Sequence, residues 1–238
     1  MTDGASPEVH HQHRDVTGGW LRPTVFGMMD GLVSNFALIA GVAGAGHSVS
    51  IRAVSLAGLA GLVGGAFSMA TGEYVSVQSQ NESMLAEVEV ERHEIKHNSA
   101  AEQAELAQLY VERGVDPGLA KQVAAQLSRD PDQALTIHVR EELGADPKSL
   151  PSPWTAAGSS LLSFSLGALI PLLPYLCGAH VLWLSAILAL VALFVAGAAT
   201  ARFTERDWVF SGARQLVLGG LAAAVTYGVG QAFGAVVG

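Results

Sequence analysis

Five apolar stretches, each long enough to cross a lipid bilayer, alternate with polar segments along this chain. About 20 apolar residues in a helix span the hydrocarbon core of a membrane. The stretches that meet this length are residues 24–46, 51–77, 155–177, 180–202 and 212–236. Short connections, among them a turn near Gly178, predict that successive helices run antiparallel. The pattern therefore predicts an all-α protein with five transmembrane helices.

The longest polar segment, residues 78–150, separates the second and third apolar stretches and carries helical signals of its own. Ser99-Ala-Ala-Glu102 matches a capping box, in which the serine side chain would bond the Glu102 amide. Two more helices are predicted where an N-cap aspartate precedes a first-turn proline, at Asp116-Pro117 and Asp130-Pro131. Two glycines, Gly114 and Gly144, are expected to end helices. We therefore expect a helical insert.

The second apolar helix is expected to run on into this insert. Neither proline nor glycine occurs between Glu73 and Lys96, so nothing in that stretch breaks a helix. Asn98-Ser99 is the first expected break, after which the chain would fold back. The insert would then be carried on one long rod.

Composition separates a membrane body from a polar insert. The chain is 50% hydrophobic and 14% charged, whereas a soluble domain is about 25% charged. Residues 78–150 contain 14 of the 21 acids and 7 of the 13 bases. The predicted parts are a disordered cytosolic tail over 1–23, helices over 24–77, the insert over 78–150, and helices over 151–238.

Basic residues predict the orientation, because they collect on the cytoplasmic side of a membrane. They flank the first apolar stretch and lie around the loop between the fourth and fifth, at Arg14, Arg22, Arg202, Arg206 and Arg214. Arg52 alone falls on the opposite side. We therefore expect a cytosolic N-terminus and insert. The Ala, Gly and Val content favours a bacterial plasma membrane, with a vacuolar membrane as the alternative.

Two acids interrupt the first two apolar stretches. An ionised carboxylate within a membrane costs a few kcal/mol or more, so Asp30 and Glu73 call for a functional reason. Met69 and Glu73 are four residues apart and share a helix face. Carboxylate and thioether ligands together suit a first-row divalent ion such as Fe²⁺ or Mn²⁺. The three residues predict a cation path, the alternative being acids bonded to helix ends for structural reasons.

Small residues recur on the same helices at spacings of four. These are Gly27 and Gly31 around Asp30, and Gly61 and Gly65 before Met69. Such stripes let helix backbones approach closely in lipid. Taken alone, they predict close packing and no further function.

Paired carboxylates mark the insert. Glu91 with Glu94, and Glu102 with Glu105, are each three residues apart, so each pair shares a face of its helix. If the chain folds back at Asn98, the two pairs would face each other, as in bundle proteins that bind iron. The alternative is an acidic, solvated surface. His93 and His97, like His10, His11 and His13 of the tail, are either ligands or solvated.

The residues around these acids resemble a known family. Val25-Phe-Gly-Met-Met-Asp-Gly-Leu-Val-Ser-Asn35 and Gly65-Ala-Phe-Ser-Met-Ala-Thr-Gly-Glu-Tyr-Val-Ser76 are similar to the first two helices of the vacuolar iron transporter family. The insert, with Arg140-Glu-Glu-Leu-Gly144, resembles its cytosolic metal-binding domain. The resemblance covers about residues 20–237. It implies a homodimer of five-helix subunits that exports cytosolic Fe²⁺, and often Mn²⁺, in exchange for protons.

The resemblance also implies roles for individual residues. Asp30, Met69 and Glu73 would line an ion path between subunits. The implied insert ligands are Glu91, Glu94, Glu102, Glu105 and Glu142. Plant members of the family place a Met-Met pair before the last of these, where this chain has His138-Val139. His138 could replace a sulfur ligand with imidazole, whereas Val139 cannot coordinate a metal.

We therefore expect a transporter and not an enzyme, with Fe²⁺ or Mn²⁺ as its substrate and no prosthetic group. Lipid and divalent ions would be its partners, and no nucleic acid. The sequence has no phosphate-binding loop, which argues against an ATP-driven pump. One alternative is a membrane-anchored iron sensor or store without transport. Another is a di-iron oxidase, but that needs a repeated Glu-x-x-His motif, and Glu94-Ile-Lys-His97 is a single copy.

Overall fold

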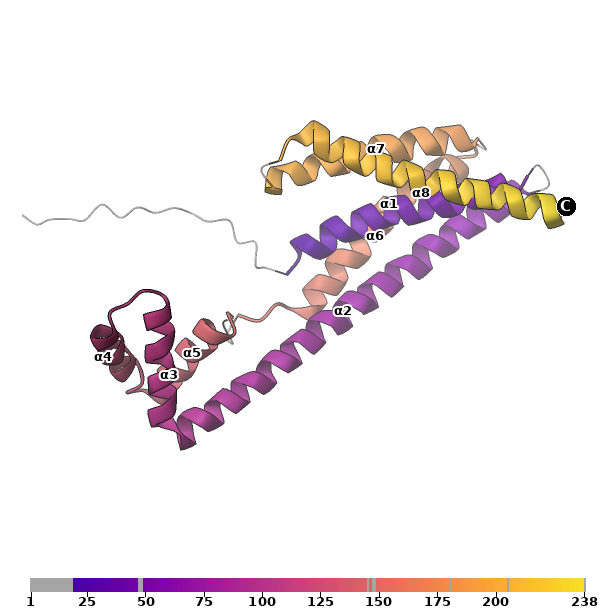
Figure 1. Ribbon diagram of the computed structural model, residues 1–238. Helices are drawn as coiled ribbons and strands as arrows, with labels where there is room; N and C mark the ends of the chain where they lie inside the picture. The colour runs from indigo at the N-terminus through magenta and orange to yellow at the C-terminus, as the bar shows by residue number, and fades with distance from the viewer. Residues whose placement is uncertain are drawn as a thin grey trace, which may run out of the picture.

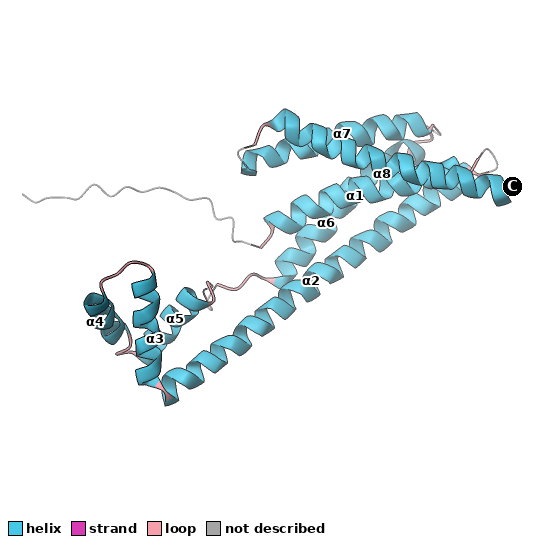
Figure 2. Ribbon diagram, in the orientation of Figure 1, coloured by secondary structure: helices cyan, strands magenta, loops and turns pink. Residues whose placement is uncertain are grey.

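The computed structural model describes residues 19–46, 49–144, 146, 149–179, 181–204 and 206–237 (Figure 1). All secondary structure in these residues is helical (Figure 2). In chain order the helices are α1 (Leu21–Gly44), α2 (Ile51–His97), α3 (Ser99–Glu112), α4 (Pro117–Leu127), α5 (Pro131–Glu142), α6 (Pro153–Leu176), α7 (Leu182–Thr204) and α8 (Trp208–Val237). The predicted all-α class is confirmed.

Five of these helices are long and apolar enough to cross a membrane: α1, α2, α6, α7 and α8. Their positions agree with the five predicted spans, and the protein is an integral membrane protein. We call α1, residues 51–77 of α2, and α6 to α8 the membrane bundle. Within it α1 packs against all four other helices, and α1 and α6 are the most buried of the five (Figure 1).

The outer surface of the membrane bundle is apolar. Leu56 and Phe67 of α2 are 68% and 64% exposed, and Phe233 of α8 is 68% exposed. Such residues would be costly to leave in water, whereas lipid tails accept them at no cost. The exposed apolar side chains are thus a second sign, independent of helix length, that this bundle lies in a bilayer.

Glycines let α1 and α6 approach closely, as their spacing predicts. A Cβ atom added at Gly31 would overlap the carbonyl oxygen of Phe164, and one at Gly167 would overlap the carbonyl oxygen of Met28. At Gly27 it would overlap the Ser163 hydroxyl. Because the helix faces on both sides are flat, the backbones themselves form the contact. Asp30 is thereby held at a fixed position beside the α1–α6 seam.

α2 is one uninterrupted helix of 47 residues, as the lack of glycine and proline predicts. It begins where the Ser50 hydroxyl accepts a hydrogen bond from the Ala53 amide. It then leaves the membrane bundle and ends beside α3 and α5 (Figure 1). His97 is its last residue, and α3 starts at Ser99, so the predicted break at Asn98 is confirmed.

The helix boundaries in the polar segment follow their sequence signals with one exception. Asp116 and Asp130 accept hydrogen bonds from amides at the starts of α4 and α5. Gly114 and Gly144 have φ of 92° and 64°, the left-handed conformation expected after a helix. The predicted capping box is wrong: the N-cap of α3 is Asn98, and no side chain caps it.

The connection between α7 and α8 is shorter than the predicted loop. α8 starts at Trp208, four residues before the predicted span, because the Asp207 carboxylate accepts a hydrogen bond from the Phe210 amide at 2.8 Å. At the other end of the chain, α1 starts at Leu21. The tail histidines, His10, His11 and His13, lie outside the described residues.

Candidate functional site

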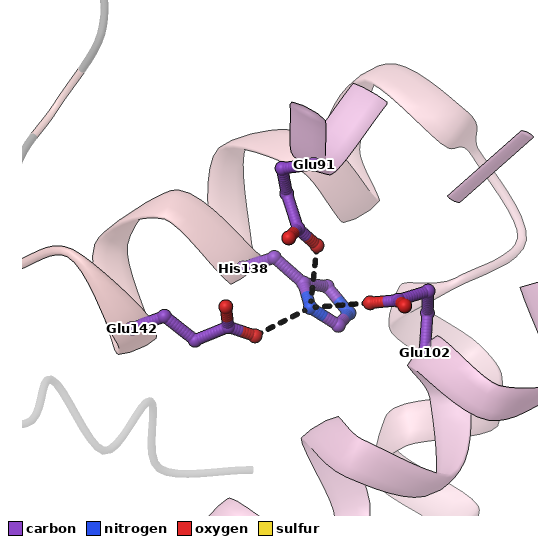
Figure 3. Close-up of side chains that lie close together, drawn as sticks. All are labelled: Glu91, Glu102, His138 and Glu142. Carbon is purple, nitrogen blue, oxygen red and sulfur yellow. Dashed lines mark hydrogen bonds and ion pairs between the residues drawn. The ribbon is translucent and has the colours of Figure 1, made fainter. Parts of the chain in front are cut away.

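Four of the predicted ligands meet where α2 ends beside α3 and α5. Glu91 comes from α2, Glu102 from α3, and His138 and Glu142 from successive turns of α5 (Figure 3). We call these four side chains the metal centre. One ligand atom from each lies within 4.8 Å of the ligand atoms of all the others. Three helices thus bring together residues separated by up to about fifty positions in the sequence.

His138 occupies the middle of the metal centre (Figure 3). Its Nδ1 lies 3.0 Å from a Glu91 oxygen, 3.0 Å from a Glu142 oxygen and 3.7 Å from a Glu102 oxygen. In the metal-free protein an Nδ1–H group can donate to one of these oxygens. A bound cation would take the place of that proton, because a histidine ligand binds through its neutral ring.

The separation of the ligand atoms suits one divalent cation. Oxygen and nitrogen ligands lie about 2.0–2.4 Å from such ions, so two ligands on opposite sides are about 4–5 Å apart. The spread of 4.8 Å falls in this range. Three carboxylates with one imidazole form a mixed donor set that suits Fe²⁺, Mn²⁺ or Zn²⁺ better than Ca²⁺.

The metal-free centre is electrostatically unfavourable. Burial, followed by the nearby carboxylates of Glu142 and Glu102, raises the pKa of Glu91 from 4.5 to about 7. Burial also raises the pKa of Glu102. The His138 ring is 1% exposed, and its Nε2 has no hydrogen-bond partner. A cation would relieve the repulsion between the acids, which is the physical sign of a site built to bind one.

A small hydrophobic core holds the metal centre in place. Val139 is fully buried and packs with Val88, Leu135 and Ile95 between α2 and α5. This valine, which cannot coordinate a metal, therefore supports the helix that carries His138 and Glu142. Glu141, which precedes Glu142 in the sequence, is not part of the metal centre and forms an ion pair with Arg113, the residue after α3.

The other two predicted insert ligands lie outside this group. The carboxylate of Glu94 accepts a hydrogen bond from Asn98, and this bond lowers its pKa. Glu105 is exposed, though its charge contributes to the raised pKa values of Glu91 and Glu102. Each predicted carboxylate pair thus supplies one member to the metal centre. His93 and His97 stack with ring centroids 4.1 Å apart on the exposed face of α2.

The sequence gives Glu102 two competing roles, as part of a capping box at the start of α3 and as a metal ligand. Ser99-Ala-Ala-Glu102 fits a capping box, which would turn the Glu102 side chain back toward its own helix end. Instead Glu102 is buried and points at His138. A glutamate at this position can serve the helix end or the metal centre, but not both.

The membrane bundle contains a second polar site. A cavity of about 280 Å³ between α1 and α2, here called the α1–α2 cavity, is lined by the predicted path residues Asp30 and Met69. Most of its other lining residues are polar or small, and they include Ser34, Asn35, Ser68, Gly61 and Gly65. Two of the three predicted path residues therefore share one hollow between the two helices.

Glu73 is buried but does not line this cavity. It is 9% exposed and lies one turn closer to the polar segment than Met69 on α2. The next residue, Tyr74, packs its ring against Trp154 at the start of α6, with centroids 4.8 Å apart. Glu73 thus sits near the end of the membrane bundle from which the polar segment extends.

Asp30 also faces a second hollow on the other side of α1. This cavity, of about 530 Å³, lies between α1 and α8 and is lined by Arg22, Gln215 and Asp30 among mainly apolar residues. The carboxylate therefore stands between two hollows. Neither Arg22 nor Gln215 was singled out as a site residue from the sequence, because a polar residue at a helix end has an ordinary interfacial role.

Comparisons with known proteins show the family to which this chain belongs. A model of the VIT family matches residues 21–231. A vacuolar iron transporter of Acanthamoeba castellanii is 39% identical over 220 residues, covering 90% of this chain and 78% of the relative. Vacuolar iron transporter 1 of Oryza sativa subsp. japonica is 33% identical over 98% of this chain and 94% of its own length. Vacuolar iron transporter 1 of Arabidopsis thaliana is 34% identical over 92% and 88%.

Proposed function

Because this chain belongs to the VIT family, we propose that it is a transporter that moves Fe²⁺ out of the cytosol across a membrane. The observation that carries the proposal is the α1–α2 cavity, where Asp30 and Met69 line one hollow between the two helices. A carboxylate at membrane depth is expensive unless it serves a cation or a proton. The names of the relatives, which are vacuolar iron transporters, support iron as the cargo.

The metal centre would capture the ion before transport. It stands at the far end of α2, away from the membrane bundle, and its four ligands suit the same ions as the cavity. The distribution of arginines supports a cytosolic location for this polar segment. The ion would then pass Glu73 and Met69, which lie on α2 in that order from the polar segment, and reach Asp30.

Proton exchange would provide the driving force. The carboxylates of Asp30 and Glu73 can each hold a proton when no metal is bound, so metal loading releases protons and metal release takes them up. The hollow on the α8 side of Asp30 gives the same carboxylate a second approach. We further propose that Mn²⁺ is also carried, since the ligands do not separate it from Fe²⁺.

Two copies of the chain would form the working unit. The apolar outer face of α2, which includes Leu59, Val63 and Phe67, is exposed, and a second copy would cover part of it in place of lipid. The membrane would be a bacterial plasma membrane or, in the alternative, that of a vacuole. The metal ion is cargo in this scheme and not a prosthetic group.

A membrane-anchored iron sensor or store is the second candidate. The metal centre favours it, because its preformed ligands would bind an ion whether or not the helices conduct one. In that case the membrane bundle would serve only as an anchor. The two functions differ in one requirement: transport needs Asp30, and anchoring does not.

Flux through proteoliposomes separates the two. Purified protein is reconstituted around a dye that Fe²⁺ quenches, with a pH dye in parallel samples. The wild type should carry Fe²⁺ with opposite proton movement, and Asp30→Asn should slow the flux about 100-fold or more because the negative ligand is lost. Thr226→Val, on α8, is the control. Equal flux through the wild type and Asp30→Asn would leave only the anchoring function.

A further inference from the structure

Asn35 is the most buried polar side chain that lines the α1–α2 cavity. It is 2% exposed and lies five residues beyond Asp30 on α1. Its Nδ2 donates a hydrogen bond of 2.6 Å to the carbonyl oxygen of Ala168 on α6. A carbonyl can only accept, so this bond fixes the amide: the nitrogen faces α6, and Oδ1 must face away from it.

The Oδ1 atom of Asn35 has no hydrogen-bond partner within the described part of the chain, although it is buried. A buried acceptor without a partner costs about 1–3 kcal/mol, so native proteins rarely keep one without a use. The atom points toward α2 at Gly61, where an added Cβ atom would lie 2.8 Å from it. Glycine at this position therefore leaves no Cβ atom between the oxygen and the cavity.

The geometry of α1 fixes how deep Asn35 lies in the membrane bundle relative to Asp30. Five residues of α1 correspond to about 7.5 Å along the axis. α1 starts beside Pro151, at the end of the bundle nearest the polar segment. Asn35 therefore lies deeper in the membrane bundle than Asp30, while Met69 and Glu73 lie toward the polar segment.

We propose that Asn35 Oδ1 is a direct ligand for the divalent cation, at a second position deeper than Asp30 in the same cavity. This inference rests on the proposed transport function. An amide oxygen is a good ligand for Mn²⁺ and Fe²⁺ but carries no charge, so it holds a cation less tightly than a carboxylate. Conduction requires sites that bind an ion and then let it leave. Asn35 provides the weaker of the two positions, from which the ion moves on.

The test compares three variants in the Fe²⁺ flux assay at limiting Fe²⁺. Asn35→Leu keeps the volume and removes the ligand, and should lower flux about tenfold or more. Gly61→Ala places a Cβ atom 2.8 Å from Oδ1 and 2.5 Å from a Leu38 methyl carbon, so both side chains must shift slightly and the space beside Oδ1 is filled. It should lower flux severalfold. Gly64→Ala, at a glycine of α2 with open space around it, should match the wild type.

Each outcome decides the proposal. If Gly61→Ala transports at the wild-type rate, the inference is overturned whatever Asn35→Leu does, because a loss in Asn35→Leu alone would reflect only the bond to α6. Melting temperature and gel-filtration profile check that the variants are folded. If Asp30→Asn slows the Fe²⁺ flux while the Asn35 and Gly61 variants transport at the wild-type rate, the proposed transport function stands and Asn35 is not a ligand.

A binding measurement covers the case in which the wild type carries no Fe²⁺ and the proposed function fails. The detergent-solubilised chain carrying Glu91→Gln, Glu102→Gln and Glu142→Gln lacks the metal centre, and Mn²⁺ bound to it is followed by electron paramagnetic resonance. Adding Asn35→Leu should weaken that binding about tenfold. Unchanged binding, or no Mn²⁺ bound before Asn35 is changed, overturns the inference.

Discussion

The metal centre and the α1–α2 cavity offer related ligands to a cation in opposite arrangements. In the metal centre four side chains from three helices converge within 4.8 Å around a buried histidine. In the cavity one carboxylate, one thioether and several neutral oxygens line a hollow of about 280 Å³. A tight, highly charged site retains an ion, whereas a wide site of lower charge lets it pass. The contrast supports the proposed roles, which are capture for the metal centre and passage for the α1–α2 cavity.

The largest change in metal affinity should follow from removing two acids of the metal centre. Glu102→Gln with Glu142→Gln should lower the Mn²⁺ affinity of the full chain at least about 100-fold, because two of the three anionic ligands are lost. Competition with a fluorescent chelator in detergent measures this. Glu112→Gln, an exposed acid bonded to Gln108, is the matched control. Should Asp30→Asn weaken this affinity equally, the two sites could not be separate.

Removing the imidazole should have a smaller effect. His138→Leu fills the buried position without a ligand, and the Mn²⁺ affinity of the metal centre should fall about tenfold. The same chelator assay measures it. His93→Gln, at an exposed histidine of α2, should leave the affinity unchanged. A loss in His93→Gln comparable to that in His138→Leu would move the site toward the stacked histidines.

Acid should weaken the binding of the cation at the metal centre. The pKa of Glu91 is raised from 4.5 to about 7, first by burial and then by Glu142 and Glu102. Below pH 7 protons compete with the cation, so Mn²⁺ affinity should fall severalfold between pH 7.5 and 6. Glu91→Gln should flatten this dependence. A profile that is identical in wild type and Glu91→Gln would assign the proton to another group.

The same titration predicts the stability of the metal-free protein. Between pH 4.5 and about 7 the folded form holds a proton on Glu91 that the unfolded form has released. Stability therefore declines as pH rises through this window. Added Mn²⁺ should reverse the trend in thermal unfolding, because it replaces the proton. A metal-free melting temperature that rises with pH across this range would contradict the prediction.

The smallest expected change is the loss of stability caused by removing a helix cap. Asp116→Ala removes the hydrogen bonds to the amides of Gly118 and Leu119 and should destabilise the polar helices by about 1 kcal/mol. Thermal unfolding measures this loss. Fe²⁺ flux should change less than threefold, since α4 supplies no ligand to the metal centre. A large loss of flux would show that α4 takes part in transport.

Local signals predicted the fold well because most of them act within one or two helical turns. Apolar runs gave the membrane spans, Asp-Pro pairs gave the starts of α4 and α5, and the absence of glycine and proline gave the full length of α2. The predicted start of α8 is wrong, because the sequence places Asp207 in a loop, whereas its carboxylate caps the first turn of α8. Each of these features depends on neighbours in sequence.

The sites were less predictable because they depend on contacts between distant segments. The sequence places Glu91 and Glu94 on one face, but only the packing of α5 against α2 brings Glu91 to His138, whereas Glu94 bonds to its near neighbour Asn98. The sequence marks Asn35 only as the last residue of the Val25–Asn35 motif, because its importance comes from its contact with Ala168, more than a hundred residues away. A polar residue in an apolar helix next to a glycine-rich partner was the available signal.

The unbroken length of α2 makes it a lever. Glu91 and Glu73 are eighteen residues apart on one helix, which fixes them about 27 Å from each other. If the membrane portion tilts by about 5°, a point 27 Å further along moves by about 2 Å, which is comparable to a metal–ligand bond length. Because α3 and α5 supply the remaining ligands and are tied to α2 by packing at its far end, a change of angle inside the bilayer would carry the whole metal centre with it and change its distance from the membrane bundle.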